Sequence, residues 1–223
     1  MSDNALRPGS VTRPSLLLYD WDNTLVDGWA GITAALNAAF DAFTLPHWSV
    51  QDTRERARVS MRESFPKLFG DDWKRARDIF LASLSEQHLD HVRPMDGAAE
   101  LLVAGAAWTQ GVVSNKTGRF LRAEVTHLGW DSHFRTVVGA GDAAADKPDP
   151  ASILLALSNL SANPDPTIWY LGDTASDMQA ARAAGITAVL VGDASHDGGV
   201  AHADPDIHFS SAHALAAMLR SLA

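Results

Sequence analysis

The sequence predicts an α/β protein built on a parallel sheet, with one helical insertion. Short apolar runs of strand length recur along the chain, and helical patterns separate them, which is typical of strand–helix–strand units. The first run, Leu16-Leu17-Leu18-Tyr19, stops abruptly at Asp20, as expected for a strand buried on both faces. From about Gly28 to Arg93 the alternation ceases and the pattern is helical.

Four later apolar runs predict the remaining strands of the sheet. They are Gly111-Val112-Val113, Thr136-Val137-Val138, Ile168-Trp169-Tyr170-Leu171 and Ala188-Val189-Leu190-Val191. Helical stretches fall between them, at 97–107, 152–160 and 177–184. The helix after Lys147 has two start signals, because Asp149 can cap it and Pro150 can occupy its first turn.

The long helical segment divides the chain. One apolar stripe with helical spacing runs through Ile32, Leu36, Ala39, Phe40 and Phe43, and a second through Trp73, Ala76, Phe80 and Leu84. The segment is too long for an ordinary connection between two strands. We therefore predict a flexible tail at 1–14, a sheet-containing core at 15–27 and 94–223, and a helical subdomain at 28–93.

The composition argues against nucleic-acid and membrane partners. The formal net charge is −9, so no excess of Lys and Arg is available to neutralise phosphates or a membrane surface. There is no cysteine, which excludes disulfides, thiolate metal sites and thiol nucleophiles. No apolar run has signal-peptide length near Met1 or approaches the roughly 18 residues of a membrane helix, and we expect a cytoplasmic location.

Asp20 and Asp22 follow the first predicted strand. In an extended segment, residues i and i+2 point to the same side, so the two carboxylates can lie together. Such a pair can hold a divalent cation or share the work of nucleophile and acid. Asp22-Asn23 is also compatible with an ordinary turn.

Three further polar features follow later strands. Ser114-Asn115 can hydrogen-bond phosphate oxygens or cap a helix, and Lys147 can offset phosphate charge or be an exposed lysine. Asp173 and Asp177 can form a hard-cation site or complement a helix dipole. Because ligands bind at the carboxyl ends of parallel strands, all four features can converge on one site.

Taken in order, these motifs resemble the haloacid dehalogenase superfamily, specifically its aspartate-nucleophile phosphatases. The matching segments are Asp20-Trp21-Asp22-Asn23-Thr24, Ser114-Asn115-Lys116, Lys147-Pro148 and Gly172-Asp173 to Asp177. The resemblance covers nearly the whole chain after Pro14 and implies a Rossmann-like core. The helical insertion resembles the cap of the phosphoglycolate-phosphatase-like branch.

The resemblance implies a role for each motif residue. Asp20 would attack phosphorus and form an aspartyl-phosphate, and Asp22 would act as general acid and then general base. Mg²⁺ would be bound by Asp20, the Asp22 backbone carbonyl, Asp173 and, directly or through water, Asp177. The residues expected to hold the phosphoryl oxygens are Thr24, Ser114, Asn115 and Lys147.

The resemblance also leaves alternatives open. Asp22 argues against a dehalogenase, since halide leaves without a proton whereas an alkoxide needs an acid. A sugar phosphomutase uses the same core, and hydrolysis is favoured on frequency alone. A non-catalytic binding protein is disfavoured by the intact set of motif carboxylates and Lys147. The sequence leaves the substrate, a small phosphorylated metabolite, and the oligomeric state open.

Two groups of charged or titratable side chains lie outside the motifs. Arg58 and Arg62 are four residues apart in the insertion and can share a helix face. We hypothesise that one of them meets a second anionic group of the substrate, such as a carboxylate. The late histidines His196, His202, His208 and His213 have irregular spacing, which favours a surface loop and a final helix over a zinc site.

Overall fold

The computed structural model describes residues 13–56 and 61–223, without the side chains of 61–63 and 88. Of the tail predicted at 1–14, only residues 13 and 14 are described. Arg58 lies outside the described residues. Arg62 falls within a helix, but its side chain is outside the description. Among the described residues, no helix combines the length and apolar character that a bilayer crossing requires.

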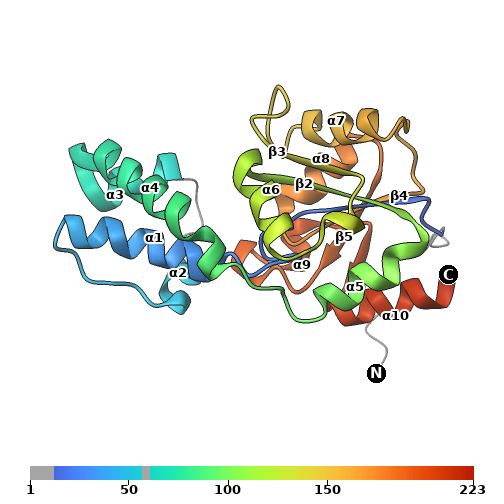
Figure 1. Cartoon of the computed structure of the whole chain (residues 1–223), viewed down its shortest axis with the longest axis horizontal. Coiled ribbons are helices and arrows are strands. Elements are labelled where there is room, and N and C mark those ends of the chain that lie inside the picture. The colour runs from blue at the N-terminus through green and yellow to red at the C-terminus, as the bar shows by residue number, and fades with distance from the viewer. Residues whose placement is uncertain (1–12, 57–60) are drawn as a thin grey trace. The chain divides into compact units, whose positions relative to one another are not determined.

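The core contains one six-stranded sheet in which every strand pair is parallel. The strand order is β3-β2-β1-β4-β5-β6, and β1 and β4 are central neighbours (Figure 1). The predicted α/β fold class is confirmed. The strands are β1 (Leu16–Tyr19), β2 (Thr109–Thr117), β3 (Thr136–Ala140), β4 (Ile168–Gly172), β5 (Thr187–Val191) and β6 (Ile207–Phe209).

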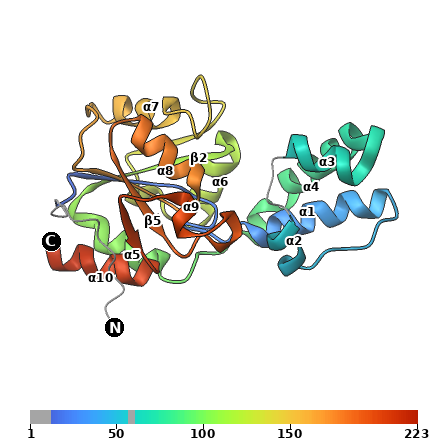
Figure 2. The same cartoon turned by 180° about the vertical axis from the view of Figure 1, so that it is seen from behind.

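Helices cover both faces of the sheet (Figures 1 and 2). On one face, α7 and α8 pack on alternate residues of the strands, including Leu18, Tyr170 and Leu190. On the other, α5 and α10 lie side by side. The core helices are α5 (Ala98–Ala104), α6 (Gly118–His127), α7 (Ala151–Asn159), α8 (Ala175–Ala183), α9 (Val200–Ala203) and α10 (Ala212–Leu222), with 3₁₀ turns η2 (Gly105–Ala107), η3 (Asp131–His133) and η4 (Ser195–Asp197).

The central strands are buried on both faces. All four residues of β1 and all five of β4 are inaccessible or nearly so, which explains their continuous apolar runs. With the strands fixed by burial, each loop at their carboxyl ends starts from a defined position. Polar residues near the carboxyl ends of β1, β2 and β4 are thereby brought together. Ser114 and Asn115 lie inside β2, which runs on to Thr117, and not after it as the sequence predicts.

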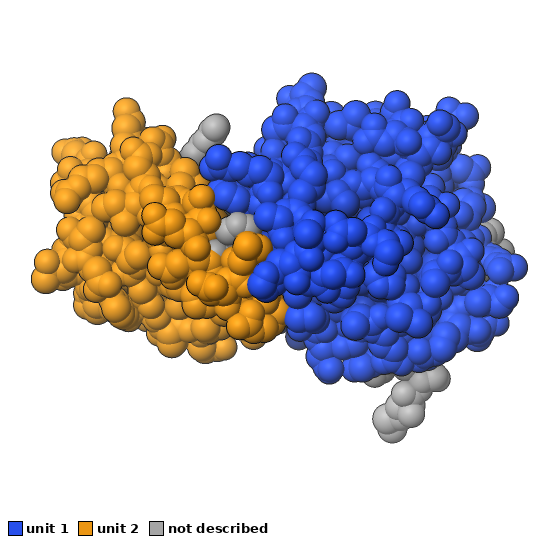
Figure 3. Space-filling view, viewed as in Figure 1, with its two compact units in different colours: residues 1–26, 94–223 blue, residues 27–93 orange. Residues whose placement is uncertain are grey.

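The chain divides into two compact units, residues 1–26 with 94–223 and residues 27–93 (Figure 3). The described part of the smaller unit is helical and has its own aromatic core, in which Phe69 packs against Phe40, Phe43 and Phe65. Its helices are α1 (Trp29–Ala42), α2 (Val50–Arg56), α3 (Met61–Phe69), η1 (Gly70–Asp72) and α4 (Trp73–His91).

Candidate active site

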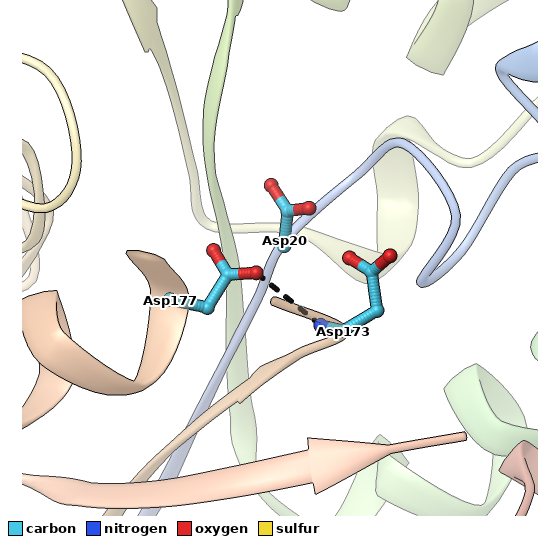
Figure 4. A group of neighbouring side chains, drawn as sticks. All are labelled: Asp20, Asp173 and Asp177. Carbon is cyan, nitrogen blue, oxygen red and sulfur yellow. Dashed lines mark hydrogen bonds between the residues drawn. The ribbon is translucent and has the colours of Figure 1, made fainter. Parts of the chain in front are cut away.

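Three buried carboxylates meet at the carboxyl edge of the sheet. Asp20 follows β1, Asp173 follows β4, and Asp177 lies in the first turn of α8. One carboxylate oxygen from each lies within 4.8 Å of the others (Figure 4). The backbone N–H of Asp20 donates to the carbonyl of Leu171 at 2.7 Å, which ties the end of β1 to β4.

Lys147 supplies a buried cation to this cluster. Its ammonium donates to Asp20 Oδ1 at 2.6 Å, to Asp177 Oδ1 at 2.7 Å and to the Tyr170 hydroxyl at 2.8 Å. Tyr170 in turn donates to the carbonyl of Val113 at 2.7 Å. All three N–H bonds of the ammonium are therefore used, and its position is fixed by the sheet.

Sequence reasoning gave Tyr170 no role beyond the strand. The signal was present, because a tyrosine buried inside an apolar strand needs a partner for its hydroxyl. Which partner it finds depends on strand order, since Tyr170 reaches Lys147 and Val113 from β4.

The start of α8 fixes Asp177. Asp177 Oδ2 accepts hydrogen bonds from Thr174 Oγ1 at 2.6 Å, from the Thr174 N–H at 3.0 Å and from the Asp173 N–H at 3.2 Å. With Thr174 as N-cap, this is a capping box. A Cβ on Gly172 would lie 2.5 Å from Asp177, so only glycine permits this approach.

Burial dominates the electrostatics of the cluster. It raises the pKa of Asp20 to about 8, because repulsion from Asp177 and Asp173 adds to desolvation and the attraction of Lys147 offsets only part of the rise. Burial also raises the pKa of Asp173. For Lys147, burial alone would lower the pKa, but Asp177 and Asp20 outweigh it and the pKa lies well above its ordinary value.

The donor set fits a hard divalent cation. The Lys147 ammonium bonds two of the three carboxylates, Asp20 and Asp177, so the ionised cluster carries more negative charge than this ammonium offsets. Carboxylate oxygens are the ligands that Mg²⁺ and Ca²⁺ prefer. The side chain of Asp22 does not belong to this cluster.

Asp22 is instead held by Lys116. The Lys116 ammonium donates to Asp22 Oδ1 at 2.8 Å and to Glu124 Oε2 at 2.8 Å. Burial alone would lower the pKa of Lys116, but the carboxylates of Asp22 and Glu124 outweigh it and raise the pKa. Sequence reasoning placed Lys116 in a motif without a role and did not consider Glu124.

Of the four residues predicted to hold phosphate, Lys147 contacts Asp20 directly and the other three bond to neighbouring groups. Thr24 Oγ1 donates to Asp173 Oδ1 at 3.2 Å, and Ser114 Oγ accepts from the Lys116 N–H at 3.2 Å. Asn115 clamps the Lys147 backbone, since Nδ2 donates to its carbonyl and Oδ1 accepts from its N–H, both at 2.9 Å. The structure thus gives the Asn115 side chain a use that the sequence did not predict, namely placing Lys147.

The turn after β1 explains Asn23. Its φ of 63° lies in the left-handed region, which asparagine tolerates better than most residues. The turn is closed by hydrogen bonds from the N–H groups of Leu25 and Val26 to the carbonyl of Trp21.

His196 also borders the site. Its Nε2 lies 3.1 Å from Asp173 Oδ2, and the nearby Asp173 carboxylate raises the pKa of the imidazole. The neighbouring Asp197 accepts from the Ala175 N–H at 2.7 Å, which fastens the η4 turn to α8. Sequence reasoning placed His196 in a surface loop, because irregular spacing gives no sign of a contact made 23 residues away.

The parallel sheet and the acidic, metal-competent site at its carboxyl edge are those of an α/β enzyme with a carboxylate-lined site. The family model for haloacid dehalogenase-like hydrolases matches residues 17–198. The chain belongs to this family, and the predicted resemblance is confirmed.

Named relatives of the chain are phosphatases. An N-acetylmuramic acid 6-phosphate phosphatase of Pseudomonas aeruginosa is 31% identical over 188 residues, covering 80% of this chain and 82% of the relative. A phosphoglycolate phosphatase of Xylella fastidiosa is 29% identical over 191 residues, covering 82% of each.

Solved structures share the fold. A HAD-superfamily hydrolase from Ehrlichia chaffeensis is 27% identical, with a TM-score of 0.67 over 95% of this chain and 98% of that one. A predicted phosphoglycolate phosphatase from Haemophilus somnus has a TM-score of 0.79 at 22% identity, over 93% of this chain and 98% of that one.

Proposed function

We propose that this chain is a Mg²⁺-dependent phosphatase that hydrolyses a small phosphomonoester through an aspartyl-phosphate on Asp20. The observation that carries the proposal is the contact of Asp20 with Lys147 inside a buried carboxylate cluster. A carboxylate held by an ammonium at the carboxyl edge of the sheet is a suitable nucleophile for phosphorus. The phosphatase names of its relatives support the same reaction class.

Asp20 and Asp22 divide the chemistry. The Asp20 carboxylate forms a bond to phosphorus while the bond from phosphorus to the leaving oxygen breaks, and Asp22 delivers a proton to that oxygen. Water then attacks the aspartyl-phosphate, Asp22 takes its proton, and Asp20 is released as carboxylate. Lys147, placed by Asn115 and Tyr170, holds Asp20 and would offset the charge of the phosphoryl group, whose oxygens Thr24 and Ser114 would bind.

The metal belongs with the acidic cluster. Asp20 and Asp173, with Asp177 directly or through water and the Asp22 carbonyl, would bind Mg²⁺. Bound there, the cation would offset the repulsion between carboxylate and phosphate. Asp177 has a second role, because both of its oxygens already accept hydrogen bonds and it fixes Lys147.

The substrate is a small phosphorylated metabolite. The two relatives' names specify phosphoglycolate and N-acetylmuramic acid 6-phosphate, both of which carry a carboxylate as well as a phosphate. A phosphoglycolate-like substrate is therefore our first candidate. The 28–93 unit, acting as a cap, would select it, with Arg58 or Arg62 as the partner of the carboxylate.

A phosphate-release screen tests the proposal. Purified protein is assayed with small phosphoesters in Mg²⁺ and in EDTA, beside Asp20→Asn and the matched control Asp71→Asn, an exposed carboxylate of the helical unit. We expect release with Mg²⁺ in the wild type and in Asp71→Asn, and a loss of at least about 10³-fold in Asp20→Asn or in EDTA.

Release that persists in Asp20→Asn would refute the mechanism. Conversion of a sugar phosphate into its isomer without phosphate release would favour the phosphomutase alternative.

A further inference from the structure

Trp21 connects the nucleophile loop to a buried acid that is not part of the metal cluster. Its indole packs edge-on against Trp130 and Phe134, with ring centroids 5.8 and 6.4 Å apart. Its Nε1 donates to Glu124 Oε2 at 2.6 Å. The side chain between Asp20 and Asp22 therefore anchors a residue of α6.

Glu124, which is bonded to Trp21, also bonds Lys116. The glutamate side chain is only 1% exposed, and the oxygen that accepts from Trp21 also accepts from the Lys116 ammonium at 2.8 Å. A lysine stem has several rotatable bonds and loses considerable freedom when its ammonium is fixed. Glu124 restricts the Lys116 ammonium to one place.

Lys116 in turn fixes one oxygen of Asp22. Its ammonium donates to Asp22 Oδ1 at 2.8 Å, while the Asp22 side chain remains 28% exposed. No hydrogen bond from another described residue reaches Asp22 Oδ2. One oxygen is held by the protein, and the other is available to a substrate.

We propose that Glu124, anchored by Trp21, is a positioning residue that holds Lys116 against Asp22 Oδ1 and so presents Asp22 Oδ2 to the leaving oxygen. This inference rests on the proposed function, in which Asp22 delivers the proton to the leaving group as its bond to phosphorus breaks. Neither Glu124 nor Trp21 contacts the reacting atoms; both act through Lys116.

Leaving-group dependence separates this role from simple packing. An alkoxide needs a proton as it leaves, whereas p-nitrophenolate is stable enough to leave with little help. A misplaced Asp22 therefore slows hydrolysis of an alkyl phosphate much more than hydrolysis of p-nitrophenyl phosphate. A general loss of folded protein slows both equally.

The experiment measures kcat and KM for phosphoglycolate and for p-nitrophenyl phosphate at saturating Mg²⁺. The variants are Glu124→Gln, which keeps the shape but removes the charge, and Trp21→Phe, which removes the indole donor. Tyr19→Phe is the matched control, because it removes a buried β1 donor that bonds Gln110 at 2.8 Å, away from Asp22.

We expect Glu124→Gln to lower kcat for phosphoglycolate roughly 10- to 100-fold, with KM little changed and p-nitrophenyl phosphate affected less than about 3-fold. Trp21→Phe should show the same selectivity at smaller amplitude. Tyr19→Phe should keep the ratio of the two kcat values.

A third variant, Lys116→Gln, and a double-mutant cycle complete the test. Lys116→Gln should reproduce the selective loss, and adding Glu124→Gln to it should add little, because Glu124 acts through Lys116. Equal losses for both esters, additive losses in the cycle, or selectivity in Tyr19→Phe would overturn the inference while leaving the phosphatase intact. A wild type inactive on both esters would overturn the proposed function as well.

Discussion

Burial and chemistry oppose one another at Asp20. The residue is 6% exposed and lies beside Asp173 and Asp177, an environment that favours its neutral form. In the proposed role of nucleophile, Asp20 must be ionised. Lys147 meets part of this cost through its 2.6 Å contact, and a divalent cation bound to the cluster would meet more.

This opposition predicts a pH-dependent stability of the metal-free protein. Because the pKa of Asp20 rises from 3.8 to about 8 on folding, its protonated form favours the native state below pH about 4, and this contribution is lost as pH rises through about 8. Asn cannot ionise, so Asp20→Asn does not lose folding stability in this way as the pH rises. In EDTA at pH 8 we expect its Tm to exceed that of the wild type by roughly 5 °C.

Thermal unfolding monitored by circular dichroism checks this, with Asp71→Asn as control. The gain should shrink toward pH 5, where wild-type Asp20 is protonated in the native state. A wild type that is more stable than Asp20→Asn at pH 8 would contradict the assigned environment of Asp20.

At the scale of elements, the N-terminus of α8 contributes both to folding stability and to the position of Asp177 in the site. The sequence predicts an acidic residue in the first turn of α8, which suits the helix dipole. The structure adds the capping box, through which Thr174 orients Asp177 and Asp177 in turn contacts Lys147. Substitution of the cap should therefore affect activity as well as folding.

Thr174→Ala is expected to destabilise the protein by about 1–2 kcal/mol and to lower kcat roughly 10-fold, because Asp177 loses its hydroxyl partner. The matched control is Ser211→Ala, since Ser211 caps α10 by accepting from the Ala214 N–H at 3.2 Å. Urea unfolding should show a comparable loss for the two variants, with activity retained in Ser211→Ala. If Thr174→Ala and Ser211→Ala lowered kcat equally, the α8 cap would have no specific role in positioning Asp177.

The same scale shows what sequence patterns can predict. The five apolar runs became strands because a doubly buried strand must be continuously apolar, as in β1 and β4. The strand β6 was not predicted, since three residues, Ile207-His208-Phe209, are too few to show the alternation of apolar and polar side chains that marks a strand.

Contacts between distant side chains were the harder part of the site. Asp20, Asp173 and Lys147 could be expected to converge, because each follows a strand of a parallel sheet. Tyr170, Glu124 and His196 could not, since their partners lie on other elements and depend on strand order and helix placement. Their contacts are visible only in the folded chain.

For the molecule as a whole, Mg²⁺ binding to the acidic cluster should stabilise the folded core and raise its Tm. A ligand that binds only the native state stabilises it by about 2.7 kcal/mol at a hundredfold excess over its Kd. For a protein of this size, Mg²⁺ should raise the Tm by roughly 5–10 °C. The shift should disappear in Asp173→Asn and persist in Asp71→Asn, in a scan of Tm against Mg²⁺ concentration. A shift that survives in Asp173→Asn would place the cation elsewhere.

The most direct test of the central claim locates the phosphoryl group. Asp22→Asn, which lacks the proposed base for water, is mixed with p-nitrophenyl phosphate and Mg²⁺ and quenched in acid. The protein is then mapped by peptide mass spectrometry. We predict a phosphoryl group on the peptide containing Asp20, absent when Asp20→Asn is added. A phosphoryl group on any other residue, or steady phosphate release from Asp20→Asn, would contradict the account.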